Sequence, residues 1–525
     1  MSEKTLENKK DNGYIYLAVS LVLGIIFLLF YSVTTSPLSY NFIGSDSAFF
    51  QAVGKLMHSG KLMYRDIYDQ KGPLLYFIEY LGYCFPNGRY GVLFIQALFM
   101  SANIIALKKT VWVLELKNKA AVFMFSTFFF FLCLSLYFDC GNLTEEYSLP
   151  FIFISLFLHF KGMKEKKYAR YVAYVYGIGF GLIALIRITN SVLIDVCMLH
   201  LFLMCLIKKD FKNAILHSLR FGIGAVAAMA PFFAYYAIKG SFYDFFNTVF
   251  IFAYKYATGN SFLTRVINSR WSALVPFILF CIIAIFFCRK NLEKTLFISL
   301  TLFFTLFVLF LGYSFVHYYQ LIIIPMIAAM LLVFDENNKM FKPFCIILVF
   351  SIILISNRID FVTRNGRMVS TIVLNTEKRA NTKIGQILKQ YIEINNYEFC
   401  GYQSKEAHED ILNHIPEEYR NSVYSYSGGP QWLLYSDTDP YCRYCETADS
   451  FANISPDVEK EIIDMFNTRP PKYLVSNHKE KVKNEKIINL IDSKYETIYS
   501  NEKLDLLVNK EFAQSFYSLD ETLSD

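Results

Sequence analysis

One stretch of this sequence reads Gly44-Ser-Asp-Ser-Ala-Phe-Phe-Gln51 and resumes as Met63-Tyr-Arg-Asp-Ile-Tyr-Asp-Gln-Lys-Gly-Pro-Leu-Leu-Tyr76. It lies between two long apolar runs and carries Asp46, Asp69 and Lys71. Charged groups are not needed to hold helices in lipid, and the Lys-Gly-Pro segment leads directly into an apolar, aromatic one. We therefore expect the charges at the membrane surface, and the chemistry in this loop. The alternative is a solvated loop without a function.

The composition is that of a membrane protein with many spans. The chain has 525 residues, of which 54% are hydrophobic and 18% aromatic, too many for an ordinary soluble protein. The net charge of +6 comes from Lys and Arg clusters between apolar runs. Such clusters mark the cytoplasmic side of a membrane protein, so the lipid bilayer is an expected partner and nucleic acid is not.

Apolar runs of spanning length predict about eleven transmembrane helices. The expected spans are 14–34, 90–114, 120–138, 147–160, 168–186, 191–207, 215–238, 271–288, 296–312, 318–334 and 344–356. No cleavage site follows the first run, so it is expected to be retained. The run 74–85 is too short to span and is predicted as an interfacial helix.

The basic clusters give the orientation. Lys4, Lys9 and Lys10 precede the first span, and further clusters fall in alternate loops around residues 108–119, 161–170, 208–212, 289–294 and 339–342. The positive-inside rule therefore places the N-terminus in the cytoplasm. With an odd number of spans, the C-terminus is expected outside the cytoplasm.

The character of the chain changes after residue 356. Residues 357–525 are polar, with short apolar strands at 472–476 and 504–509 and amphipathic helical patterns at 382–393, 458–466 and 486–493. The sequence thus predicts an all-α membrane domain over 1–356 and a small extracytoplasmic α/β domain over 357–525. A disulfide from Cys400 to either Cys442 or Cys445 is expected, because the exterior is oxidising.

The first loop resembles that of a known enzyme class. Asp46 and the run Tyr68-Asp-Gln-Lys-Gly-Pro-Leu74 are similar to the first external loop of the GT-C glycosyltransferases. Within that class the loop is most similar to the protein O-mannosyltransferase and aminoarabinose-transferase-like superfamily, glycosyltransferase family 39-like. The resemblance covers the first 356 residues. Two residues depart from it: Ser47 replaces a second acid, and Gly72 replaces a proline, which we expect to be harmless.

The resemblance implies roles for residues that the predicted topology brings to one external face. Asp46 matches the family's general base, and Asp69 and His317 match positions that hold a divalent metal ion in relatives. Further candidates come from the residues themselves: Glu145 and Glu146 for catalysis, and Lys71, Arg187 and Arg270 for the donor phosphate. We expect one of the two glutamates to face the site and the other to face water. Arg187 as a helix anchor and His317 as part of an aromatic belt are the alternatives.

The implied function is transfer of a sugar from a polyprenyl-phosphate donor to an extracytoplasmic glycan, lipid or protein acceptor. A transporter or flippase of lipid-linked sugars is the main alternative, although transporters place ionisable groups near the middle of the membrane, whereas these lie at the ends of spans. Asp437-Thr-Asp439 also resembles the Asp-x-Asp of nucleotide-sugar enzymes. That interpretation is disfavoured, because nucleotide sugars are scarce outside the cell.

Overall fold

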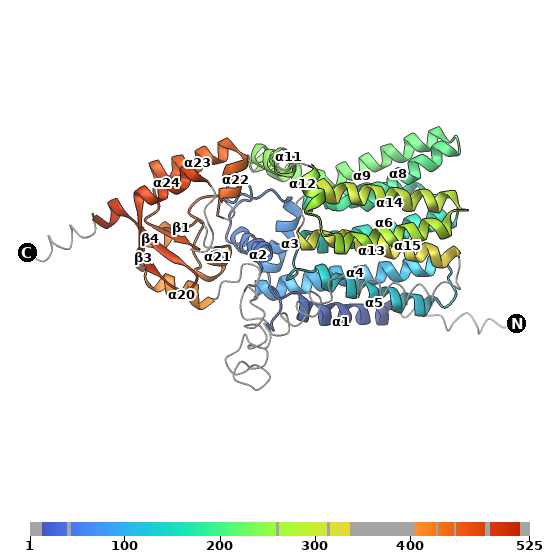
Figure 1. The fold of residues 1–525 in the computed structure, drawn as a ribbon, viewed down its shortest axis with the longest axis horizontal. Coiled ribbons are helices and arrows are strands. Elements are labelled where there is room, and N and C mark those ends of the chain that lie inside the picture. Colours follow the sequence, from blue (N-terminus) through green and yellow to red (C-terminus); the bar gives the residue numbers. More distant parts are fainter. Residues whose placement is uncertain are drawn as a thin grey trace, which may run out of the picture.

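A long helical bundle and a C-terminal α/β domain lie at opposite ends of the structure, with the short helices α2 and α3 between them (Figure 1). The computed structural model describes residues 13–38, 42, 44–258, 262–311, 315–336, 405–426, 429–445, 448–477 and 484–514. The predicted span 344–356, the boundary at 356, the helix 382–393 and Cys400 lie outside these residues.

Ten helical segments of the bundle coincide with ten of the eleven predicted spans. They are α1 (Gly13–Tyr31), α4 (Gly88–Val113), α5 (Lys119–Tyr137), α6 (Thr144–Lys164), α7 (Arg170–Arg187), α8 (Val192–Ile207), α9 (Phe211–Ile238), α13 (Trp271–Cys288), α14 (Leu292–Leu311) and α15 (Ile323–Glu336), the last preceded by the 3₁₀ turn η4 (Val316–Ile322). Most predicted ends agree within four residues. The prediction for α6 was too short, because the helix already begins at Thr144.

By length and composition alone, eight helical runs in the described residues can cross a membrane. The lower count has two causes. The run 170–207 joins α7 and α8 through the 3₁₀ turn η2 (Ile188–Ser191). In addition, α6 is 21 residues long but carries two acidic residues in its first turn and two basic residues in its last. The chain is a multi-pass membrane protein.

Contacts with α6 show that α7 and α8 run in opposite directions. Near the C-terminal end of α6, the imidazole of His159 hydrogen-bonds to Tyr176 of α7 (3.1 Å) and to His200 of α8 (3.0 Å). Near its N-terminal end, the side chain of Asn190 in η2 donates to Ser148 (3.1 Å). The turn η2 therefore lies at the opposite end of the bundle from the His159 contacts, and α7 and α8 form a hairpin.

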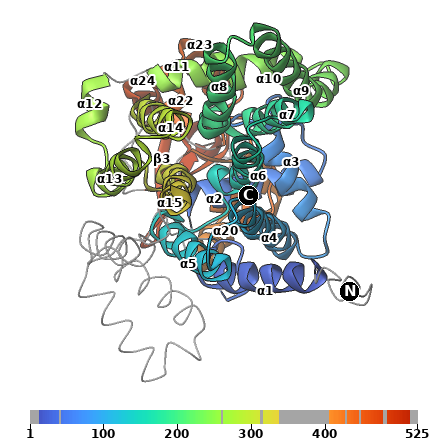
Figure 2. The same cartoon turned by 90° about the vertical axis from the view of Figure 1, so that its right-hand side faces the viewer.

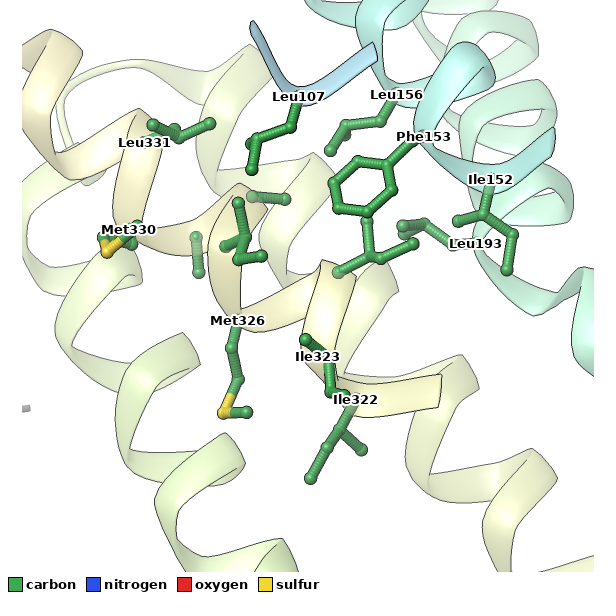
Figure 3. Packing of buried hydrophobic residues seen from close by; sticks show 14 of the residues in the cluster. Leu107, Ile152, Phe153, Leu156, Leu193, Ile322, Ile323, Met326, Met330 and Leu331 are labelled. Atoms are coloured by element: carbon green, nitrogen blue, oxygen red, sulfur yellow. The ribbon is translucent and has the colours of Figure 1, made fainter. Parts of the chain in front are cut away.

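The core of the bundle surrounds α15. Viewed end-on in Figure 2, α15 lies among α5, α6, α13 and α14, and it packs against all four. Nearly all of its residues are buried. Figure 3 shows Ile323, Met326 and Met330 of α15 in the same buried cluster as Leu107 of α4 and Phe153 of α6. A helix that is apolar on every side is expected to be buried in this way.

The elements that cap the bundle are short. They are α2 (Ser45–His58), α3 (Pro73–Tyr83), α10 (Phe242–Phe246), the π-helix η3 (Asn247–Phe252), α11 (Ala253–Thr258) and α12 (Phe262–Ile267). The predicted interfacial helix is α3, which has Pro73 at its first position, where the missing N–H of proline costs nothing. Helices α2 and α3 pack closely against each other.

The C-terminal domain is built on a four-stranded sheet of order β1-β2-β4-β3. Its elements are α20 (Lys405–Asn413), η6 (Glu417–Ser422), β1 (Val423–Ser425), α21 (Gln431–Tyr435), α22 (Ala448–Ile454), α23 (Pro456–Thr468), β2 (Tyr473–Ser476), α24 (Glu485–Lys494), β3 (Tyr495–Ser500) and β4 (Asp505–Asn509). β1 and β2 are parallel, whereas β4 is antiparallel to both β2 and β3. The predicted strands and helices in the described part are confirmed as β2, β4, α23 and α24.

Candidate functional site

The predicted base, Asp46, lies in the first turn of α2, at the end of the bundle that faces the C-terminal domain (Figure 1). Most other residues of α2 are buried, which fixes the helix in place. The Asp46 side chain itself is 43% exposed. The position thus combines a rigid support with an accessible carboxylate.

Lys71 connects the two predicted acids of the first loop. Its ammonium Nζ lies 4.0 Å from Oδ2 of Asp46 and 3.5 Å from Oδ2 of Asp69, and 5.0 Å from the ring centroid of Phe50. The Lys71 side chain is 20% exposed, so it is accessible to a ligand. The sequence prediction that these three groups lie together is therefore supported by their geometry.

Tyrosines fix the inner side of the loop. The hydroxyl of Tyr76 donates to Oδ2 of Asp69, and that of Tyr64 donates to the carbonyl of Lys71 (2.8 Å). Burial and the neighbouring Asp69 carboxylate raise the pKa of Tyr76 well above its usual value, so it stays a donor. Asp69 is nearly buried and its carboxylate is already hydrogen-bonded, in contrast to the exposed Asp46.

Gly72 attaches the loop to the end of α7. Its N–H donates to the carbonyl of Ile186 (2.9 Å), and a Cβ at this position would lie only 2.2 Å from the carbonyl oxygen of Leu185. The backbone at Gly72 is extended, at φ −76° and ψ 159°, so the glycine is not required by its dihedral angles. It is required by close approach. The departure from the proline of the relatives therefore has a structural reason in this chain.

Arg187 and Glu145 form an ion pair next to this loop. Nη1 of Arg187 lies 2.7 Å from Oε1 of Glu145, whose other oxygen accepts from the hydroxyl of Thr144 (2.9 Å). The Arg187 guanidinium carbon lies 3.6 Å from the ring centroid of Tyr318, which is a cation–π contact. The Arg187 side chain is 22% exposed and that of Glu145 is 0% exposed. Glu145 thus orients an arginine that remains accessible.

Glu146 belongs to a buried polar network. Both of its carboxylate oxygens accept from the Gln96 amide (3.0 and 3.1 Å), and one accepts from the backbone N–H of Asn142 (2.9 Å). Glu146 is 1% exposed, so the expectation that one of the two glutamates faces water is wrong. Burial at the start of α6 is compensated by hydrogen bonds, as buried carboxylates require. Glu79 of α3 is also fully buried.

His317 pairs with an acid that the sequence analysis did not single out. Its Nδ1 lies 2.9 Å from Oδ2 of Asp139. Asp139 begins a turn of four successive residues with positive φ, ending at Asn142, with angles of 46°, 74°, 76° and 60°. Non-glycine residues adopt this region only when the surroundings hold them there, and such strain often occurs at functional sites.

The proposed metal ligands have different partners. Asp69 contacts Lys71 and Tyr76, whereas His317 contacts Asp139. Within the described ranges there is no group of three or more His, Cys, Asp or Glu side chains that could hold a metal ion. A cation beside Asp69 would also meet the Lys71 ammonium, so the donor set does not fit a metal as it stands. Metal binding stays a prediction.

Arg270 stands apart from the other cations. Its backbone N–H donates to the hydroxyl of Tyr319 (2.7 Å), next to the His317 segment, and its side chain is exposed. No ion pair joins this side chain to another residue that the structure describes. Arg270 is therefore not part of the Lys71 cluster, and its exposed side chain is accessible to a bound lipid.

The C-terminal domain holds the first loop from the other side. The ammonium of Lys55 on α2 lies 2.5 Å from Asp437, and that of Lys61 lies 2.6 Å from Asp439. The N–H of Tyr68 donates to the carbonyl of Arg443 (2.8 Å). The Asp-x-Asp acids therefore serve as ion-pair partners of the loop, and sequence reasoning missed this role because the lysines lie more than 370 residues away.

Comparison with known proteins gives a match in structure only. No known protein family matches the sequence, and no curated protein is similar to it at a significant level. Two solved structures of ArnT from Cupriavidus metallidurans share the fold. The one bound to undecaprenyl phosphate has a TM-score of 0.56 and 12% identity, and the apo one has a TM-score of 0.52 and 12% identity. Both alignments cover 95% of this chain and 98% of the other.

The resemblance expected from the first loop is thereby confirmed at the level of the fold. The aligned length includes both the helical bundle and the C-terminal domain, since it covers 95% of the chain. The chain has the GT-C fold of the aminoarabinose transferase ArnT.

Proposed function

We propose that this protein is a membrane glycosyltransferase that transfers a sugar from a polyprenyl-phosphate-linked donor to an acceptor outside the cytoplasm. The observation that carries the proposal is the cluster of Asp46, Lys71, Arg187 and Glu145 at one end of a GT-C bundle. The similar ArnT structure that contains undecaprenyl phosphate supports a lipid phosphate as part of the donor.

Lys71 and Arg187 are the proposed contacts of the donor phosphate. Each is held by a carboxylate on one side and is partly exposed on the other, so each keeps positive charge available to an anion. An arginine presents several N–H donors in a plane that matches a phosphate, and the ring of Tyr318 holds this plane in orientation. Arg270, which is exposed, is proposed as a third contact.

Asp46 is the proposed general base. It is the most exposed carboxylate of the cluster, whereas Glu145 is buried and its two oxygens are hydrogen-bonded to Arg187 and Thr144. As the acceptor oxygen bonds to the anomeric carbon, its proton passes to Asp46 and the bond from that carbon to the phosphate oxygen breaks. Lys71 and Arg187 stabilise the negative charge on the departing polyprenyl phosphate. Glu145 then acts as a positioning residue.

The proposed orientation puts the N-terminus in the cytoplasm and the C-terminus outside. The site and the C-terminal domain share one end of the bundle, so they lie on the same side of the membrane in either orientation (Figure 1). The proposal routes no step through a metal ion.

Purified protein in lipid nanodiscs provides the test. With a labelled polyprenyl-phosphate sugar and envelope glycan as acceptor, the wild type is expected to form a labelled product, and Asp46→Asn is expected to reduce the rate by about 100-fold or more. Asp492→Asn, an exposed acid on α24, is the control and should change nothing. A protein that moves the lipid across the bilayer without forming product would be a flippase, and an unchanged rate in Asp46→Asn would move the role of base to Glu145 or Glu146.

A further inference from the structure

A cavity of about 520 Å³ lies where the first loop meets the C-terminal domain. We call it the junction pocket. The loop contributes Lys61, Arg65 and Asp66, the segment 440–444 contributes one wall, and α23 with the residue that follows it contributes the other. Cavities of this size bind small organic molecules or one to two sugar units. None of the roles assigned above uses this pocket.

The walls of the junction pocket combine an aromatic face with alternating charges. Its aromatic lining residues are Tyr441, which is partly exposed, and Tyr444, which is buried. Arg443 lies 2.5 Å from Glu461, with which it forms an ion pair at the pocket. The Nε of Arg443 is buried and has no hydrogen-bond partner within the described part of the chain.

The rim adds exposed polar groups of both signs. Asp464 and Arg469 line the pocket and are exposed, and Arg65 is 55% exposed although it is paired with Asp66. Paired charges of opposite sign leave no strong net field for an anion. The charged groups offer hydrogen-bond donors and acceptors to the hydroxyl groups of a saccharide, and the ring of Tyr441 offers a surface for its C–H face.

The pocket is remote from Asp46. Lys61 follows the C-terminal end of α2, whereas Asp46 is in its first turn, and a helix of 14 residues is about 20 Å long. A sugar in the junction pocket is therefore too far away to be the one that reacts. An acceptor that occupies both the junction pocket and the Asp46 site must therefore be a chain of several sugar units.

We propose that the junction pocket binds a saccharide unit of the acceptor, several units away from the hydroxyl that receives the new sugar. This inference rests on the proposed function and deepens it, because the acceptor is then a glycan chain. Contacts with a remote part of the substrate supply binding energy that positions the reacting end.

The test uses full-length protein in nanodiscs and a size-graded series of oligosaccharides released from the cell envelope of the source organism. Two pocket variants are made: the double variant Asp464→Asn/Arg469→Ala, and Thr468→Trp, which places a large ring in the cavity. The matched control is Asp457→Asn/Lys460→Ala, which changes exposed residues of α23 outside the pocket. Inorganic phosphate serves as a probe for simple anion binding.

Both pocket variants are expected to weaken oligosaccharide binding by about tenfold or more, the effect of losing hydrogen bonds to charged groups. In the transfer assay, KM for long acceptors should rise by the same factor, while kcat and the KM for a single-sugar acceptor stay unchanged. The control should behave as the wild type. Equal binding by wild type and pocket variants, or binding of phosphate but no oligosaccharide, would overturn the inference and leave the proposed function intact. Absence of any transfer by the wild type would contradict the proposed function instead.

Discussion

Gly72→Ala tests whether the catalytic loop must stay attached to α7. The new Cβ would lie 2.2 Å from the carbonyl oxygen of Leu185, whereas ordinary contact begins at 3.4 Å. The difference of about 1.2 Å has to be absorbed by backbone on both sides, because the atoms in contact are not flexible side-chain ends. The hydrogen bond from Gly72 to Ile186 lengthens or breaks, and Lys71, the preceding residue in the chain, moves with it.

A displacement of this size is expected to affect activity more than stability. Misplacement of a reacting group by about 1 Å reduces rates by about 10²-fold, whereas one strained contact costs roughly 1–3 kcal/mol of folding free energy. We expect kcat for sugar transfer to fall by about two orders of magnitude while the protein remains folded in nanodiscs. The assay measures transfer rate and thermal unfolding on the same preparation.

The control is Gly222→Ala on α9, where a new Cβ meets no atom within 4 Å. This variant should retain full activity. If Gly72→Ala turned over within about threefold of the wild type, the loop would have to relax without moving Lys71, and the argument from close approach would be refuted.

Three further outcomes are expected. Lys71→Ala should raise KM for the polyprenyl-phosphate donor by a factor equivalent to about 1.5–3 kcal/mol and should also lower kcat, because Lys71 stabilises the charge that develops on the departing phosphate; unchanged KM and kcat would remove Lys71 from the donor site. Burial raises the pKa of Glu79 well above its ordinary value of 4.5, so the folded protein keeps a proton that the unfolded chain releases. Stability should therefore fall as pH rises above about 4.5, and the fall measured by thermal unfolding should be smaller for Glu79→Gln than for the wild type. A reporter active only outside the cytoplasm should work when fused at Asp525 and fail when fused near Lys164, and activity at Lys164 would reverse the proposed orientation.

The spans of the bundle were predictable because each needs about 20 apolar residues in succession, a property that is local in the sequence. The exception, α6, shows why local properties are not sufficient. Glu145 and Glu146 precede the predicted span 147–160, but they form the first turn of the helix. Their carboxylates are compensated by Arg187 from α7 and Gln96 from α4, and no sequence pattern indicates such partners.

In the candidate site, contacts between residues close in the sequence were predictable, whereas contacts between distant segments were not. Asp69 and Lys71 are two residues apart, so their contact follows from their spacing, and the family resemblance added Asp46. The pairing of His317 with Asp139 and the stacking of Arg187 on Tyr318 join distant segments, and they require the fold.

In the C-terminal domain, too, only the strands with a local apolar pattern were predictable. β2 and β4 are apolar and were predicted. β1 has only three residues, and β3 lies at the edge of the sheet with most of its residues exposed, so neither leaves an apolar pattern in the sequence.

The contacts between the C-terminal domain and α2 have a consequence for the synthesis of the protein on the ribosome. Lys55 contacts the backbone of Leu433, which lies 378 residues later in the chain. At the usual rate of synthesis, the ribosome takes about 20 to 75 seconds to add such a length. During this interval the first loop has left the ribosome but lacks the contacts that fix it. The protein therefore completes its site only with its last domain, and a truncated product of translation would be delivered to the membrane without one.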